Sequence, residues 1–153
     1  MKRAEGAKNV ALIECLNPRR GTWRVRLDVT ETEEGAEWME HDFDHRPTAD
    51  EVRSLYVELV NSEVQQRILT GATFEGKPVW LSTENQLNFR SAPTVPVRFK
   101  MGEEPDGSPV YHTFTTQEEL EAFNKAVADY IATCLNDGWA RKDAFDVEPY
   151  LRE

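Results

Sequence analysis

Apolar and polar residues alternate in several short stretches of the chain, which is the pattern of strands that bury one face. The predicted strands cover 10–16, 23–30 and 38–44, with turns at 17–21 and 31–36. The second and third strands are expected to pair as a hairpin. The first nine residues are small and polar, and we expect them to be frayed.

Two longer stretches repeat apolar residues every three or four positions, the spacing of an amphipathic helix. The first begins at Thr48, where Glu51 lies three positions later as a capping box requires. It is expected to end at Gly71, because glycine favours the conformation that stops a helix. The second follows a further capping-box pair, Thr116 and Glu119, and is expected to end over 136–138.

Two hairpins are predicted between these helices. One covers 73–81 with Glu75-Gly76 at its turn, and the other covers 95–114 with Asp106-Gly107 at its turn. The Asp-Gly pair is a strong hairpin signal, because both residues tolerate the positive φ that such turns require.

A short helix is predicted between the two hairpins. Thr83 and Gln86 form its capping-box pair, Leu87 is expected to pack inward with Phe89 near it, and Pro93 is expected to end it. The order of elements therefore predicts an α+β fold, with antiparallel β-hairpins packed against two long amphipathic helices and one short helix.

The expected organisation has two parts and a tail. A hairpin-helix unit is predicted over 1–70, and a hairpin-helix-hairpin-helix unit over 71–145. Residues 146–153 are expected to form an irregular arm. The length also fits one compact domain built from both parts.

Charge is distributed unevenly along the 153 residues, which carry a formal net charge of −10. Residues 27–63 and 103–153 hold most of the acidic side chains, whereas the basic residues elsewhere are dilute. Nucleic-acid binding depends on a dense basic surface, so neither nucleic acid nor an anionic membrane is expected as a partner. No apolar run is long enough to predict a membrane-spanning helix.

Motifs of known catalytic chemistry are absent from the sequence, including dinucleotide-binding, phosphate-loop, zinc-protease and serine-hydrolase patterns. Cys15 and Cys134 lie far apart, and each is expected to act as a small apolar residue. We therefore predict no catalytic residue, no metal site and no cofactor.

The histidines are the residues on which a metal-dependent reaction could depend. His41 and His45 fall on one face of a predicted strand, about 13 Å apart, which is too far for one metal ion. His112 lies in another predicted strand. A small metal-dependent hydrolase built on these three residues is the remote alternative.

A partner-binding surface is predicted from five residues. The short helix displays Glu84, Gln86 and Asn88, which are expected to face solvent or a partner. Trp139 and Tyr150 are expected to be exposed aromatic anchors, because tryptophan and tyrosine are enriched at protein interfaces.

Two segments carry a resemblance to a known group of proteins. Arg67 to Phe89 holds a glycine-containing hairpin, with Gly76 at its turn, followed by a short polar helix. Pro105 to Thr116 holds a strand pair that leads into a capped helix. Together they resemble a domain of unknown function found in phage and prophage proteins of the Bacteroides type, often within or beside tail and tail-fibre components. The resemblance spans about 48–145.

The resemblance implies a non-catalytic structural or assembly protein of a phage particle. Its partners would be other tail components or a second copy of the chain, and it would lie in the host cytoplasm during assembly or in the virion. A host-directed or regulatory protein-binding module is the main alternative.

Overall fold

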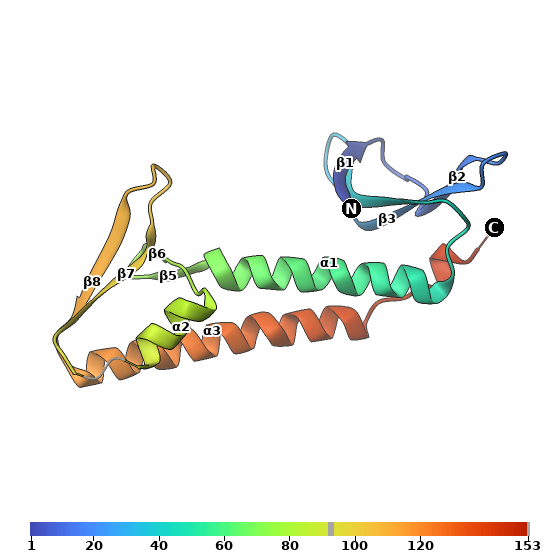
Figure 1. Cartoon of the computed structure of the whole chain (residues 1–153). Coiled ribbons are helices and arrows are strands. Elements are labelled where there is room, and N and C mark those ends of the chain that lie inside the picture. Colours follow the sequence, from blue (N-terminus) through green and yellow to red (C-terminus); the bar gives the residue numbers. More distant parts are fainter. Residues whose placement is uncertain (92–93, 153) are drawn as a thin grey trace. The chain divides into compact units, whose positions relative to one another are not determined.

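The structure is a computed structural model that describes residues 1–91 and 94–152 (Figure 1). Antiparallel sheets and three α-helices occur within these residues, which confirms the α+β class. The chain divides into two compact units, Met1–Leu59 with Ala144–Glu153, and Val60–Asp143. This division falls inside the first long helix rather than at its end, and the C-terminal tail belongs to the first unit.

A four-stranded antiparallel sheet forms most of the first unit, with strand order β1-β4-β3-β2. Its strands are β1 (Lys2–Gly6), β2 (Ile13–Asn17), β3 (Thr22–Glu31) and β4 (Ala36–Phe43). The β3–β4 hairpin confirms what the alternation predicts.

Strand β1 corrects the expectation of a frayed N-terminus. It pairs with β4 along its whole length, from Lys2 opposite Glu40 to Gly6 opposite Ala36. The sequence of β1 does not alternate apolar and polar residues, so its strand structure depends on pairing with β4. Glycine is needed at position 6, because a Cβ there would lie 2.9 Å from the ring of Trp38.

The two faces of this sheet carry different side chains. Val25 and Leu27 of β3 lie on one face and are fully buried. Arg24 and Arg26 alternate with them and therefore lie on the other face.

The polar face buries two charged residues. The guanidinium of Arg26, which is 8% exposed, donates to the carbonyl of Ala11 at 2.8 Å and to a carboxylate oxygen of Glu14 at 2.6 Å. Glu40 is 4% exposed and accepts from the indole Nε1 of Trp38 at 3.0 Å. This hydrogen bond is the main cause that lowers the pKa of Glu40.

Helix α1 (Ala49–Thr70) begins and ends as the sequence predicts. The amide of Thr48 donates to a carboxylate oxygen of Glu51 at 2.8 Å, and the amide of Glu51 donates to the hydroxyl of Thr48 at 3.3 Å. These reciprocal bonds are those of a capping box. The helix ends directly before Gly71, whose amide donates to the carbonyl of Arg67 at 2.9 Å.

The C-terminal tail is an ordered part of the first unit, which corrects the expectation of an irregular arm. Its residues include the short 3₁₀ helix η1 (Glu148–Tyr150). The ring of Phe145 stacks on that of Tyr56 with centroids 4.0 Å apart. The hydroxyl of Tyr150 donates to the carbonyl of Arg26 at 3.1 Å, so the tail is held against β3.

The second unit contains the two predicted hairpins, the short helix and the second long helix. Its elements are β5 (Ala72–Phe74), β6 (Lys77–Val79), α2 (Thr83–Arg90), β7 (Val97–Glu103), β8 (Pro109–Phe114) and α3 (Gln117–Asp143). Glu75 and Gly76 both have positive φ, as a two-residue hairpin turn requires. The amide of Trp80 donates to the carbonyl of Met101 at 2.7 Å and so links the two hairpins. Pro93 lies outside the described residues.

Phenylalanine rings form the core of the second unit. Phe89, Phe114 and Phe123 are buried, and Phe74 and Phe99 pack against them. The ring centroids of Phe123 lie 5.0 to 5.1 Å from those of Phe74, Phe89 and Phe114. Such a cluster joins α2, both hairpins and α3 through one apolar core.

Helix α3 is longer than expected, because Gly138 does not end it. The helix continues to Asp143 and lies beside the part of α1 that belongs to the second unit, antiparallel to it (Figure 1). A Cβ at position 138 would lie 2.7 Å from Cγ2 of Val64, so this glycine allows the two helices to pack closely. Its role is close approach between helices rather than termination.

Candidate functional site

Helix α2, where three of the predicted binding residues lie, is capped one residue earlier than expected. The hydroxyl of Ser82 accepts from the amide of Asn85 at 3.1 Å. Ser82 has extended backbone angles, whereas Thr83 is already helical. The Asn85 side chain adds a bond to the carbonyl of Trp80 at 2.9 Å.

The three predicted α2 residues have different surroundings. Gln86 is half-buried, and its side-chain amide donates to the carbonyl of Leu81 at 2.8 Å. Glu84 and Asn88 are exposed. Gln86 therefore anchors the helix start, while Glu84 and Asn88 are the residues that a partner can reach.

Leu87 is 64% exposed, which corrects the expectation that it packs inward. Phe89 takes the inward position and is fully buried. Two positions turn an α-helix by about 200°, so Leu87 points away from the core that Phe89 fills.

Trp139 lies on α3 and is 54% exposed, as the sequence analysis expects. Its position follows from the helix register: Gly138 faces α1, so the next residue is turned by about 100° toward the side of the pair. Had the helix ended over 136–138, this indole would have had no fixed direction.

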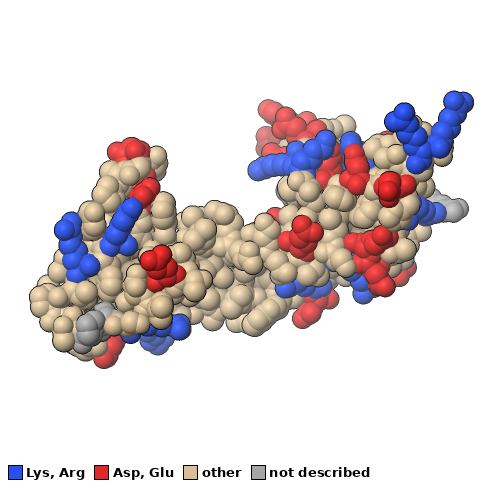
Figure 2. Space-filling model, in the orientation of Figure 1, with Lys and Arg blue, Asp and Glu red and all other residues tan. Residues whose placement is uncertain are grey.

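A continuous apolar surface runs along α3 toward Trp139. Its residues recur at three- and four-residue spacing and therefore share one side of the helix. We call this surface the α3 apolar face; it consists of Ala128, Ile131, Ala132, Leu135 and Trp139. Ile131 and Leu135 are half-buried, and Ala128 and Ala132 are exposed. Figure 2 shows a stretch without charged side chains over the C-terminal half of α1 and the middle of α3.

The opposite side of the helix pair carries charged residues that form ion pairs with one another. Arg67 donates to a carboxylate oxygen of Asp137 at 2.9 Å, and Arg141 donates to Glu63 at 2.6 Å. The hydroxyl of Tyr130 donates to the carbonyl of Arg67 at 2.6 Å. Asp137 lies two positions from Leu135, about 200° around the helix. The pair thus separates an ion-paired side from an apolar one.

Tyr150 is 6% exposed, so it is not the exposed anchor that the sequence analysis expects. Its ring lies 5.7 Å from that of Phe145, and its hydroxyl is bonded to the carbonyl of Arg26. Burial raises the pKa of Tyr150 to about 12. The residue belongs to the core of the first unit.

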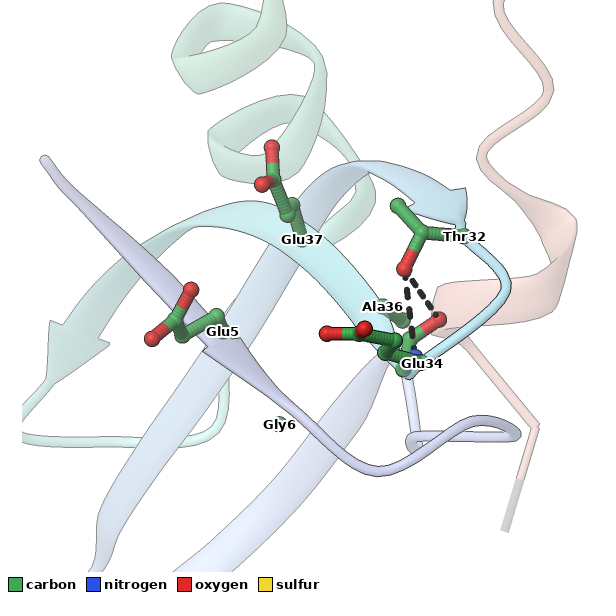
Figure 3. A pocket seen from close by; sticks show the side chains of 7 residues that line it. Glu5, Gly6, Thr32, Glu34, Ala36 and Glu37 are labelled. Carbon is green, nitrogen blue, oxygen red and sulfur yellow. Dashed lines mark hydrogen bonds between the residues drawn. The ribbon is translucent and has the colours of Figure 1, made fainter.

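A hollow of about 430 Å³ lies in the first unit, beside the β3–β4 turn (Figure 3). Its lining includes the carboxylates of Glu5, Glu34 and Glu37. Arg3 forms an ion pair with Glu37, and the hydroxyl of Thr32 accepts from the amide of Gly35. Among the described residues, its lining contains no histidine, cysteine or basic side chain.

The histidines are engaged in separate contacts. His45 bridges Asp44 and Glu51, with its ring nitrogens 2.7 and 2.8 Å from their carboxylate oxygens, and these contacts raise its pKa. His112 belongs to the second unit, where its Nε2 lies 3.0 Å from an oxygen of Glu119. Within the described ranges, no group of three or more His, Cys, Asp or Glu side chains is placed to hold a metal ion.

No family model, no curated protein and no solved structure matches the chain. Among the residues described, no helix combines the length and the apolar character needed to cross a membrane.

Of the surface residues, Leu87 is the one that sequence reasoning missed. The sequence analysis expects it to pack inward, because a leucine at helical spacing is normally core. The signal that could have placed Leu87 is its distance of two positions from Phe89: a helix this short cannot bury both on one side.

Proposed function

We propose that this protein acts through protein–protein contacts, as a structural or assembly component, and that the α3 apolar face is the surface it uses. The observation that carries the proposal is Trp139, a tryptophan that is 54% exposed at the end of a continuous apolar side of a helix. Tryptophan is enriched among the residues that dominate binding energy at interfaces.

Exposure of this indole to water is energetically unfavourable. A tryptophan buries up to about 250 Å², so covering the exposed half would remove roughly 130 Å² from water and contribute on the order of 3 kcal/mol. Leu135 and Ile131, both half-buried, would add to this. Solvent-facing helix sides usually carry charged residues, as the opposite side of this pair does.

Because of the sequence resemblance, we propose more specifically a tail or tail-fibre role. The segment that carries the resemblance, about 48–145, includes α2 and α3 and therefore the whole candidate surface. Assembly proteins act by binding other proteins, which requires a surface rather than a catalytic centre. Glu84 and Asn88 on α2 would supply polar contacts near that surface.

The test is direct binding between this protein and each protein encoded by the neighbouring genes, measured with purified components. We expect saturable binding to at least one of them, and a loss of at least tenfold in affinity for Trp139→Ser. Tyr111→Ser is the matched control, because Tyr111 is an exposed aromatic residue on β8 and lies off the α3 apolar face.

Two results would count against the proposal. Equal loss of binding in Trp139→Ser and Tyr111→Ser would show that the α3 apolar face is not the binding surface. The absence of both a protein partner and self-association would remove the role itself. A partner encoded by the host, with no tail genes beside this one, would favour the regulatory module instead of a phage component.

A further inference from the structure

The α3 apolar face has a second exposed apolar residue near it, Leu87 of α2. The side-chain amide of Asn124 donates to the carbonyl of Phe89 at 3.1 Å, which seats the end of α2 beside this part of α3. Leu87 is two residues before Phe89 and is 64% exposed. Leu87 and Trp139 are therefore exposed apolar residues near the two ends of the central part of α3.

The spacing of these groups is symmetric about the middle of α3. Trp139 lies fifteen positions after Asn124, a distance of about 22 Å along a helix. The midpoint falls between Ile131 and Ala132, in the centre of the α3 apolar face.

We propose, on the basis of the protein-contact function above, that a second copy of this chain covers the α3 apolar face, with the two α3 helices antiparallel about a two-fold axis near 131–132. In this arrangement Trp139 of each copy lies against the α2 region around Leu87 of the other. A two-fold interface brings each patch against its own symmetry equivalent, so a symmetric patch is self-complementary.

Side-chain size at the centre of the face fits a close helix crossing. Ala128 and Ala132 are the exposed residues there, flanked by Ile131 and Leu135. Packed helices approach to 8–10 Å between their axes, and small residues at the crossing allow the lower end of that range. Trp139, the largest side chain of the face, lies farther out, where two crossing helices diverge.

Charge at the ends of the face selects a second copy over an unrelated partner. Glu121 and Lys142 lie almost equally far from the midpoint, one on each side. Their hydrogen-bond partners within the chain are neutral amides: Gln117 donates to Glu121 at 3.2 Å, and Lys142 donates to Asn61 at 2.8 Å. An antiparallel two-fold sets Glu121 of one copy near Lys142 of the other, twice.

The net charge of the chain also bears on where a second copy can bind. A chain with a net charge of −10 repels its own copies, so two copies can associate only where the local charge is small or complementary. Lys125, which borders the α3 apolar face, pairs with Asp129 at 2.5 Å, so the two residues add no net charge beside it. The five residues of the face are themselves uncharged.

The first experiment is the mass of the full chain in solution, by light scattering and sedimentation equilibrium over a range of concentrations. We expect a monomer–dimer equilibrium that Trp139→Ser and Leu87→Ser each weaken at least tenfold. Tyr111→Ser should leave it unchanged. A monomer at every concentration would overturn the proposal.

Charge reversal tests the antiparallel register. Glu121→Lys alone and Lys142→Glu alone should each weaken the dimer about tenfold at low salt, because each creates two like-charge contacts. The double variant should restore wild-type association, and all differences should shrink in high salt. Two single losses that simply add in the double variant would overturn the arrangement, since the residues would then not face each other.

The outcomes separate this inference from the proposed function. A monomeric chain that binds a neighbouring gene product through Trp139 would refute the second copy and leave the function standing. A monomeric chain that binds nothing would refute both. Circular dichroism of each variant establishes that a lost interaction does not come from a lost fold.

Discussion

Trp139 and Tyr150 lie eleven positions apart, and the structure places them in opposite environments. Tyr150 packs against Phe145 and bonds to a strand carbonyl, so both its ring and its hydroxyl are satisfied within the chain. Trp139 lies on α3 with 54% of its surface exposed, on the side that carries the α3 apolar face. A sheet with a helix and a tail against it can close its core, whereas two packed helices cover only one side of each other.

Removal of the Tyr150 ring tests the closed region and has the largest expected effect. Tyr150→Ala should lower the free energy of unfolding by roughly 3–5 kcal/mol, because it leaves a large cavity and an unpaired carbonyl at Arg26. Urea denaturation followed by circular dichroism measures this directly.

Tyr150→Phe is the matched control, since it keeps the ring and removes only the hydroxyl. Its expected cost is about 1 kcal/mol, the net contribution of one hydrogen bond. If Tyr150→Ala cost no more than Tyr150→Phe, the tail would not be part of the core, and the two regions would be alike.

The helices and strands could be predicted well from the sequence, whereas the environments of Trp139 and Tyr150 could be predicted only poorly. Alternation and capping boxes are local signals, and the β3–β4 hairpin and the start of α1 agree with them. The role of Gly138 depends on a contact with Val64, which is distant in sequence. Because the helix end was misplaced, the direction of Trp139 could not be derived, although its exposure was expected.

Strand β1 and the tail were missed for a related reason. The sequence KRAEG gives no strand pattern, and its pairing depends on β4. Tyr150 lies in a short polar segment whose burial depends on the backbone of β3. The residues of the candidate surface could be named in part from sequence, since Trp139, Glu84 and Asn88 are exposed as expected, but the face that joins Trp139 to Leu135 required the helix register.

Gly138→Ala tests the packing that fixes the open region. The added methyl would lie 2.7 Å from Cγ2 of Val64, so the Val64 side chain or the helix itself must shift, and overpacking of this kind costs about 1–3 kcal/mol. The better helix propensity of alanine offsets up to about 1 kcal/mol of that. Thermal denaturation should show a lower midpoint.

Val64→Ala provides the rescue for Gly138→Ala, because it removes the atom that the new methyl would meet. The double variant should be more stable than the sum of the two single changes predicts. Simple additivity would show that Gly138 is not in contact with α1 in solution.

His45 gives the first unit a pH dependence of its own. Its pKa is raised by Asp44 first and then by Glu51. A group whose pKa is raised on folding stabilises the folded state fully below its unfolded value near 6.5, and that contribution is lost as pH rises through the folded pKa. Unfolding measured between pH 5.5 and 8.5 should therefore show stability that falls slightly with rising pH.

His45→Gln isolates this effect, because glutamine keeps a polar side chain but does not titrate. The variant should lack the decline above pH 6.5. It should retain part of the loss at low pH, because the pKa of Glu51 is lowered first by the amide of Thr48, whereas the pKa of Asp44 is lowered by His45 itself. An unchanged decline in the variant would assign it to another group.

Trp139→Ala tests the open region through the dependence of stability on protein concentration. In the monomer this change should lower the free energy of unfolding by less than Tyr150→Ala does, because 54% of the indole surface is already exposed and alanine favours the helix. The measurement is urea denaturation at low protein concentration. A loss as large as that of Tyr150→Ala there would mean that the indole packs within its own chain as Tyr150 does, and the contrast with Tyr150 would fail. At high concentration the wild type should gain stability by mass action as copies associate, and the variant should not. A residue that contributes to stability only as concentration rises contributes through its partner, which is the property that distinguishes the open region from the closed one.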